Sequence, residues 1–181
     1  MKLIFIRHGS TSGNLEHRYV GRTDELLCPE GIMALKKRSY PDCDRLLVSP
    51  LQRCIQTAEI LFPEKEMQIV PDFRECNFGD FEGKNYQELH QNPLYQKWID
   101  SGGRMPFPNG EYPQKFRERC VKAFLETLPD SGRISYIVHG GTIMAILAEF
   151  AGGNYYDYQI PNGAGYLAEW SEHKIKILEE L

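Results

Sequence analysis

Two histidines stand in similar surroundings near opposite ends of the chain. The segments KLIFIRHG and ISYIVHG each read as a buried strand that ends in His-Gly, so His8 and His139 lie just past strand ends. Carboxyl ends of parallel strands share one sheet edge, and ligands bind in the crevice outside it. We therefore expect the two imidazoles to face each other there. A single histidine could merely cap its strand with local hydrogen bonds, but the repeated pattern favours a functional pair.

Two arginines are predicted to converge on the same edge. Arg7 precedes His8, and Arg53 falls in the first turns of the helix expected within SPLQRCIQTA. Ser49 would stand at the N-terminus of that helix, where free N–H groups and the helix dipole favour an anion. Guanidinium groups bind phosphate through two parallel charge-assisted hydrogen bonds. The set indicates phosphoryl transfer without a metal, in which the arginines keep a histidine neutral and nucleophilic.

A leaving alkoxide needs a proton, and the segment DFRECNFGDFEG supplies carboxylates that can donate one. Glu75 is the best candidate for this general acid. Asp80 and Glu82 are its local competitors, and composition alone does not choose among the three.

Composition and charge restrict the class of protein. A net charge of −4 argues against a nucleic-acid or membrane-surface binder, so an anion site must be local. Five scattered cysteines without a C-x-x-C pair are typical of reduced thiols in a cytoplasmic protein. No apolar run approaches the roughly 20 residues that span a bilayer. We expect a cytoplasmic monomer or homodimer that binds a small-molecule phosphomonoester, with no metal, cofactor, nucleic acid or membrane as partner.

Strand and helix patterns alternate along the chain, which predicts an α/β fold with a mainly parallel sheet and helices on both faces. The expected strands are 2–6, 45–48, 67–70, 134–138 and 166–170. The expected helices are 29–38, 49–61, 113–128 and 142–150. Residues 1–181 are predicted to form one domain, in which 84–112, with short helical pieces near 86–91 and 94–100, is an insertion or lid.

Five ordered motifs resemble the histidine phosphatase superfamily, in the branch that includes cofactor-dependent phosphoglycerate mutase and α-ribazole phosphatase. An R-H-G triplet alone would be weak, but five motifs in the family's order are specific, and they span residues 3 to 147. The resemblance implies a three-layer sandwich like that of phosphoglycerate mutase. The motifs are LIFIRHGSTSGN, GRTDELLCPEG, VSPLQRCIQTA, RECNFGDFEG and IVHGGTIMAIL.

The resemblance also implies a role for each candidate residue. His8 becomes the phosphorylated nucleophile, and Glu75 the general acid that later activates water. Arg7, Arg53 and His139 would bind and polarise the phosphoryl group. The further binding positions that it implies are Asn14, the backbone at Gly140, and Arg18.

The chain departs from the family pattern at several positions. Ser10 follows R-H-G where the family usually has Glu or Gln, and Tyr112 replaces a Ser after Glu111. Cys28 replaces the usual Thr or Ser before the helix at Pro29, and a poor N-cap is expected to cost that helix about 1 kcal/mol.

Three functions compete. A mutase must keep water from the phosphohistidine and rebind its intermediate in a second orientation, which requires a closed and strongly basic pocket. Segment 84–133 is short for a mutase insertion and has no dense basic cluster. We therefore predict a metal-independent phosphomonoester hydrolase, closest in appearance to α-ribazole phosphatase, with phosphoglycerate mutase as the alternative. A non-catalytic phospho-ligand binder would be expected to have lost the nucleophile or the acid, and both are present.

Overall fold

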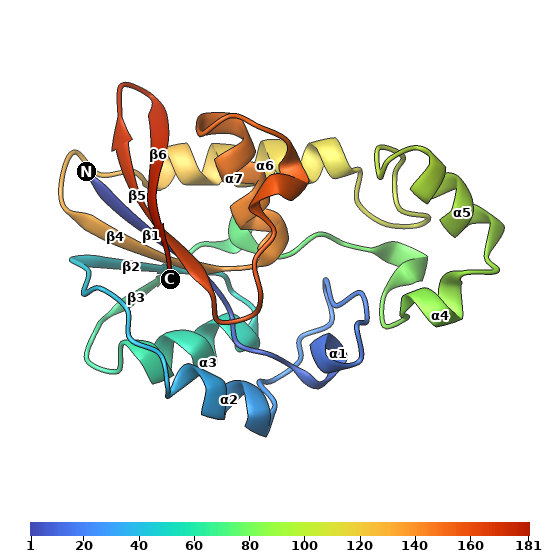
Figure 1. Ribbon diagram of the computed structural model, residues 1–181, viewed down its shortest axis with the longest axis horizontal. Coiled ribbons are helices and arrows are strands. Elements are labelled where there is room, and N and C mark those ends of the chain that lie inside the picture. Colours follow the sequence, from blue (N-terminus) through green and yellow to red (C-terminus); the bar gives the residue numbers. More distant parts are fainter.

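A computed structural model describes all of residues 1–181. Its centre is one six-stranded sheet of order β3-β2-β4-β1-β5-β6, with helices on both faces (Figure 1). The predicted α/β fold is therefore confirmed. The strands are β1 (Lys2–Arg7), β2 (Arg45–Val48), β3 (Met67–Ile69), β4 (Arg133–Val138), β5 (Gly165–Ser171) and β6 (Lys174–Glu180).

The helices divide between the two faces of the sheet. Helices α6 (Pro113–Thr127) and α7 (Gly140–Phe150) cover one face, and α2 (Pro29–Leu35) and α3 (Gln52–Leu61) cover the other (Figure 1). Successive residues of a strand point to opposite faces, so the uninterrupted apolar run of β1 supplies both cores. Leu3 and Phe5 enter the larger core cluster, and Ile4 and Ile6 enter the smaller one.

Strand register brings the two histidines together. In the parallel β1–β4 pair, Arg7 is the partner of Val138, so the next residues, His8 and His139, leave the sheet side by side. The His8 N–H continues the ladder by donating to the Val138 carbonyl over 3.0 Å. The two strand ends that were predicted to meet are thus adjacent.

The sheet is less uniform than predicted. Three of its five strand pairings are parallel, but β5 runs antiparallel to both β1 and β6. Strand β6 was not predicted, because charged residues fill most of this edge strand and Ile175 is its only buried residue.

Helix ends differ from prediction in three places. The helix expected from Ser49 begins at Gln52 with Leu51 as N-cap, α2 ends at Leu35, and α7 begins two residues early, at Gly140. The weak N-cap predicted at Cys28 is a real cap, since its Sγ accepts the Gly31 N–H over 3.4 Å. No helix combines the length and the apolar content needed to cross a membrane.

Segment 84–112, which we call the aromatic lobe, projects from one end of the sheet (Figure 1). It carries α4 (Tyr86–Leu89) and α5 (Pro93–Asp100), so both predicted helical pieces are confirmed. A third core cluster that includes Tyr95, Phe107 and Phe116 anchors the lobe against α6. The remaining helical elements are α1 (Ser12–Leu15), η1 (Pro71–Phe73), η2 (Gly79–Phe81) and η3 (Tyr155–Tyr158). That this lobe acts as a lid stays a prediction.

Candidate active site

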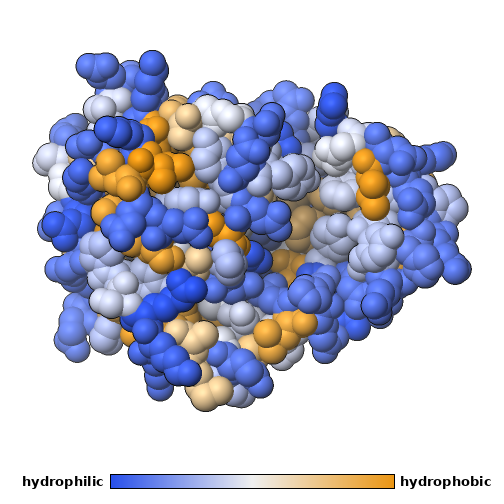
Figure 2. Space-filling view, in the orientation of Figure 1, coloured by the Kyte–Doolittle hydropathy of each residue, from blue (hydrophilic) through white to orange (hydrophobic).

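A cavity of about 830 Å³ opens beyond the carboxyl ends of β1 and β4. Figure 2 shows the surface hollowed between the sheet-bearing body and the aromatic lobe. Five residues predicted for the phosphoryl end of the site line it, namely Arg7, His8, Asn14, Glu75 and Gly140. Arg53 and His139 are fully buried behind that end.

His8 is held in one tautomer. Its Nδ1 lies 2.7 Å from the Gly9 carbonyl, which can only accept, so Nδ1 carries the proton. Nε2 in turn accepts a long 3.3 Å hydrogen bond from Nε of Arg53, which can only donate. Burial, then Arg53 and Arg7, keep the pKa of His8 well below its ordinary value. The result is a neutral imidazole whose weakly engaged Nε2 lone pair can attack an electrophile.

His139 faces His8 edge-on, with ring centroids 5.1 Å apart. Its Nε2 lies 2.7 Å from Oγ of Ser49, and burial, then Arg53 and His8, lower its pKa well below the ordinary value. The prediction that Ser49 starts the α3 helix was wrong. The Ser49 N–H still bonds the Ile137 carbonyl of the sheet, so the helix forms only beyond Pro50 and the hydroxyl is left to orient His139.

Arg53 is fixed by the loop that covers it. Its Nη1 donates to the Thr23 carbonyl over 2.8 Å, and its Nη2 donates to the carbonyls of Gly21 and Val20. The N–H groups of Gly21 and Thr23 both donate to Oε1 of Glu82, over 2.7 and 2.9 Å. Glu82, one of the three acid candidates, therefore supports the loop that holds Arg53 and does not line the cavity.

Arg7 combines an anchored end with a free donor. Its Nη1 donates to the Ile160 carbonyl over 2.6 Å, whereas its buried Nε has no hydrogen-bond partner. Gly140 is the first residue of α7, and a Cβ there would lie only 3.4 Å from that Nε. Because the first N–H groups of a helix also lack intrahelical partners, an anion at this point would find several free donors.

Glu75 is the only one of the three candidate acids that lines the cavity. Its oxygens accept the N–H groups of Cys76, over 2.8 Å, and of Gly141 in the first turn of α7, over 3.4 Å. Burial raises the pKa of Glu75, although these hydrogen bonds and Arg53 oppose the shift. Asp80 is exposed and accepts both hydrogen bonds of the Asn109 amide, so it is occupied elsewhere.

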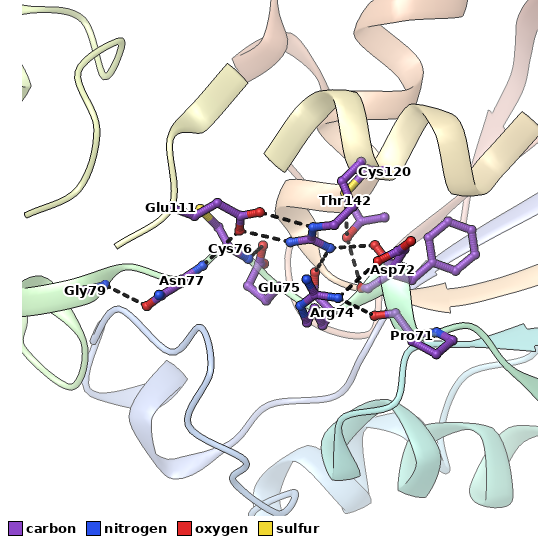
Figure 3. Close-up of polar contacts among 12 residues, drawn as sticks. Pro71, Asp72, Arg74, Glu75, Cys76, Asn77, Gly79, Glu111, Cys120 and Thr142 are labelled. Atoms are coloured by element: carbon purple, nitrogen blue, oxygen red, sulfur yellow. Dashed lines mark hydrogen bonds and ion pairs between the residues drawn. The ribbon is translucent and has the colours of Figure 1, made fainter. Parts of the chain in front are cut away.

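An ion pair that we did not predict supports the segment that carries Glu75. Nε and Nη2 of Arg119 donate to the two oxygens of Glu111 over 3.1 and 2.9 Å, and its Nη1 donates to the carbonyls of Asp72 and Arg74. The Glu111 carboxylate also accepts the Asn77 N–H over 3.3 Å. Figure 3 shows Glu111 beside the chain that runs through Glu75. The pair thus ties that chain to α6 on both sides of the carboxylate.

The two remaining predicted side chains, Asn14 and Arg18, differ in whether a polar group is left free to bind a ligand. Oδ1 of Asn14 accepts the Asn162 amide over 3.1 Å, so its own NH₂ group is left to face the cavity. Arg18 also lines the cavity, but its guanidinium lies 2.6 and 2.7 Å from the carboxylates of Glu16 and Glu88. Its charge is already neutralised.

Thr57 is a supporting residue that sequence reasoning missed. Its hydroxyl donates to the Arg53 carbonyl over 2.6 Å and accepts the Gly9 N–H over 3.0 Å. It thereby links α3 to the turn that holds His8. The only sequence signal was its place one helical turn after Arg53.

Comparisons with known proteins agree with this geometry. The model of the histidine phosphatase superfamily (branch 1) matches residues 3–180. An adenosylcobalamin/α-ribazole phosphatase of Escherichia coli K12 is 28% identical over 163 residues, which cover 84% of this chain and 80% of that protein. An uncharacterized phosphatase, PhoE, of Bacillus subtilis is 30% identical over 158 residues, which cover 82% of this chain and 77% of that protein.

Solved structures share the fold along almost the whole chain. A phosphoglycerate mutase from Thermus thermophilus has a TM-score of 0.80 at 29% identity, covering 100% of this chain and 98% of its own. An α-ribazole phosphatase from Shigella flexneri has a TM-score of 0.82 at 23% identity, covering 98% and 95%. At that lower identity the likeness concerns the fold alone.

Proposed function

This chain belongs to the histidine phosphatase superfamily, and we propose that it hydrolyses small-molecule phosphomonoesters through a phosphohistidine formed on His8. One observation carries the proposal. A neutral His8 whose Nε2 lone pair is only weakly engaged by Arg53 lines the same cavity as Arg7 and Glu75, a carboxyl group of raised pKa. This arrangement supplies a nucleophile, an anion site and a proton donor within one cavity.

In the first step Nε2 of His8 attacks phosphorus, and the N–P bond forms as the ester P–O bond breaks. The hydrogen bond from Nδ1 to the Gly9 carbonyl stabilises the positive charge that develops on the ring. Arg7 and Arg53 stabilise charge on the non-bridging oxygens. Protonated Glu75 gives its proton to the leaving oxygen, which departs as an alcohol.

In the second step the ionised Glu75 takes a proton from a water molecule as that water's oxygen attacks the phosphohistidine. The N–P bond breaks, the electron pair returns to Nε2, and inorganic phosphate leaves. Both residues then have their starting protonation states, so the cycle needs no other reactant.

The relatives indicate which ester to test first. The similarity to adenosylcobalamin/α-ribazole phosphatases makes α-ribazole 5'-phosphate that ester. The outer cavity supports a leaving group with a flat ring, since aromatic side chains such as Phe78, Trp98 and Phe107 line it. Because none of the five cysteines forms a disulfide, we also propose that the enzyme works in the cytoplasm.

Phosphoglycerate mutase is the second candidate, favoured by the T. thermophilus structure of that name at 29% identity. A mutase needs unneutralised cations that hold a bisphosphate in two orientations. Outside the phosphoryl end, Arg18 is paired with two carboxylates, which leaves Arg117 as the one unneutralised arginine that lines the cavity, too few cations for a second phosphate. Hydrolysis is therefore the activity that we propose.

The test combines turnover with trapping of the intermediate. Phosphate release from an ester panel would be measured with EDTA present, together with isomerisation of 3-phosphoglycerate with and without a bisphosphate primer. Mass spectrometry after rapid quenching at alkaline pH should find one phosphoryl group on His8. Isomerisation faster than phosphate release would overturn the phosphatase assignment, and turnover without a phosphohistidine would overturn the mechanism.

A further inference from the structure

Arg117 is the one arginine of the cavity with no polar partner. Three arginines line the cavity: Arg7 is anchored to a backbone carbonyl, Arg18 is held by two carboxylates, and Arg117 makes no hydrogen bond or ion pair. The carboxylate of Glu118 next to it is turned toward Gln114 and Lys115. The charge of Arg117 is therefore available to a ligand.

Tyr155 holds this guanidinium in place. The Cζ atom of Arg117 lies over the Tyr155 ring, 4.0 Å from its centroid. A cation above a ring is attracted to the ring face, and such stacking leaves the N–H groups at the edge of the guanidinium plane free. Arg117 is therefore oriented without using the donors that would bind a ligand.

The stacked pair lies on the side of the cavity where the leaving group must depart. The Tyr155 hydroxyl donates to the Gly141 carbonyl over 3.3 Å, and the Gly141 N–H donates to Glu75 over 3.4 Å. Arg117 is thus connected to the proposed acid through the Tyr155 side chain and one residue of α7, Gly141. A group attached to the leaving oxygen that Glu75 protonates can reach Arg117.

We propose that Arg117 is a specificity-determining residue that binds a carboxylate carried by the leaving group. This inference rests on the proposed phosphatase function and adds the substrate class to it. A planar guanidinium with a free edge matches a carboxylate through two parallel hydrogen bonds. The surrounding aromatic side chains, including Phe116 and Tyr155, favour a leaving group in which that carboxylate is attached to a ring or another apolar body.

Matched esters and matched variants test this assignment. We would measure kcat/KM for phenyl phosphate, for 3- and 4-carboxyphenyl phosphate, and for α-ribazole 5'-phosphate, whose leaving group has no anion. The wild-type enzyme should prefer the better carboxyphenyl ester over phenyl phosphate by about 10-fold, the value of one charged hydrogen-bonded contact. In R117Q that ratio should fall to about one, and R117K should restore part of it.

The control is R104Q, which removes the same charge from an exposed arginine of the aromatic lobe that does not line the cavity. It should keep the wild-type ratio. If the wild-type enzyme hydrolyses none of the esters, the proposed function fails. The inference about Arg117 fails if the wild-type enzyme hydrolyses the carboxyphenyl and phenyl esters with a kcat/KM ratio near one, or if it prefers α-ribazole 5'-phosphate. It also fails if R117Q keeps the wild-type ratio. In each of these cases the proposed phosphatase function stands. Circular dichroism would verify that each variant folds.

Discussion

The two ends of the cavity are built by different kinds of contact. At the phosphoryl end, His8 and His139 leave adjacent parallel strands, and every functional side chain is tied to a backbone group or a buried hydroxyl. At the outer end, short helices and the turn at η3 contribute aromatic rings that meet mainly ring against ring.

This difference assigns the two ends different tasks. Side chains held by a sheet have fixed positions, which in-line phosphoryl transfer requires. Ring contacts tolerate exchange of one apolar side chain for another, so the outer end can change its ligand without moving the nucleophile. We therefore expect substitutions at the inner end to lower turnover of every ester, and those at the outer end to change the ranking of esters.

The largest effect is expected for H8A. Removal of the nucleophile should lower kcat by roughly 10⁴-fold or more on all esters, as loss of a covalent nucleophile does in other hydrolases. H139A serves as the comparison, since it should weaken turnover but still form the phosphohistidine. Equal turnover by the wild type and H8A would show that His8 is not the nucleophile.

The next effect is expected for E75Q, and it should depend on the leaving group. The kcat/KM on an alkyl phosphate, which reports the phosphorylation step, should fall by about 10²- to 10³-fold, whereas that on 4-nitrophenyl phosphate, whose leaving group needs no proton, should fall much less. In the wild type, kcat/KM on alkyl esters should decline as rising pH ionises Glu75, whose raised pKa shifts this decline toward neutral pH. An equal loss on both classes of ester would argue for a structural role of Glu75.

R119M tests whether the supporting ion pair positions Glu75. We expect kcat/KM on alkyl esters to fall by about 10-fold, because small displacements of a catalytic group are costly. The free energy of unfolding should fall by about 2 kcal/mol, less than for a fully buried pair, since both partners keep some exposure. R119K should recover part of the activity. A loss of the same size on 4-nitrophenyl phosphate would show that the pair stabilises the fold without positioning the acid.

The smallest effect concerns stability against pH. His8 and His139 are buried, and their pKa values in the folded protein lie well below those in the unfolded chain. Below about pH 6.5 the unfolded chain therefore binds more protons than the folded protein does. As the pH falls, each histidine should lower the free energy of unfolding by up to about 1.4 kcal/mol per pH unit, until the pH reaches the pKa of that histidine in the folded protein. Urea titrations at pH 7.5 and 5.5 would measure the slope, and H139Q should reduce it.

The inner end of the cavity is predictable from the sequence because regular structure determines it. A strand that ends in His-Gly can be recognised, and parallel pairing then dictates that two such ends meet, as His8 and His139 do. Glu75 could not be separated from Asp80 and Glu82 by pattern, because only the folded chain turns Glu82 toward the loop at Gly21 and leaves Asp80 exposed. The outer end escaped prediction for a related reason. The stack of Arg117 on Tyr155 joins residues of α6 and η3 through tertiary packing that leaves no local pattern.

Glu82 also provides a way to measure how often the inner end of the cavity opens when no substrate is bound. Its Oε1 accepts the amide protons of Gly21 and Thr23, and the carbonyls of the same two residues accept from Arg53. Amides in a surface turn usually exchange with solvent quickly, because such turns open by local fluctuation. These two can exchange only when the carboxylate releases them, and Arg53 then loses the turn that holds it. Deuterium uptake at Gly21 and Thr23 therefore measures how often the resting active site opens.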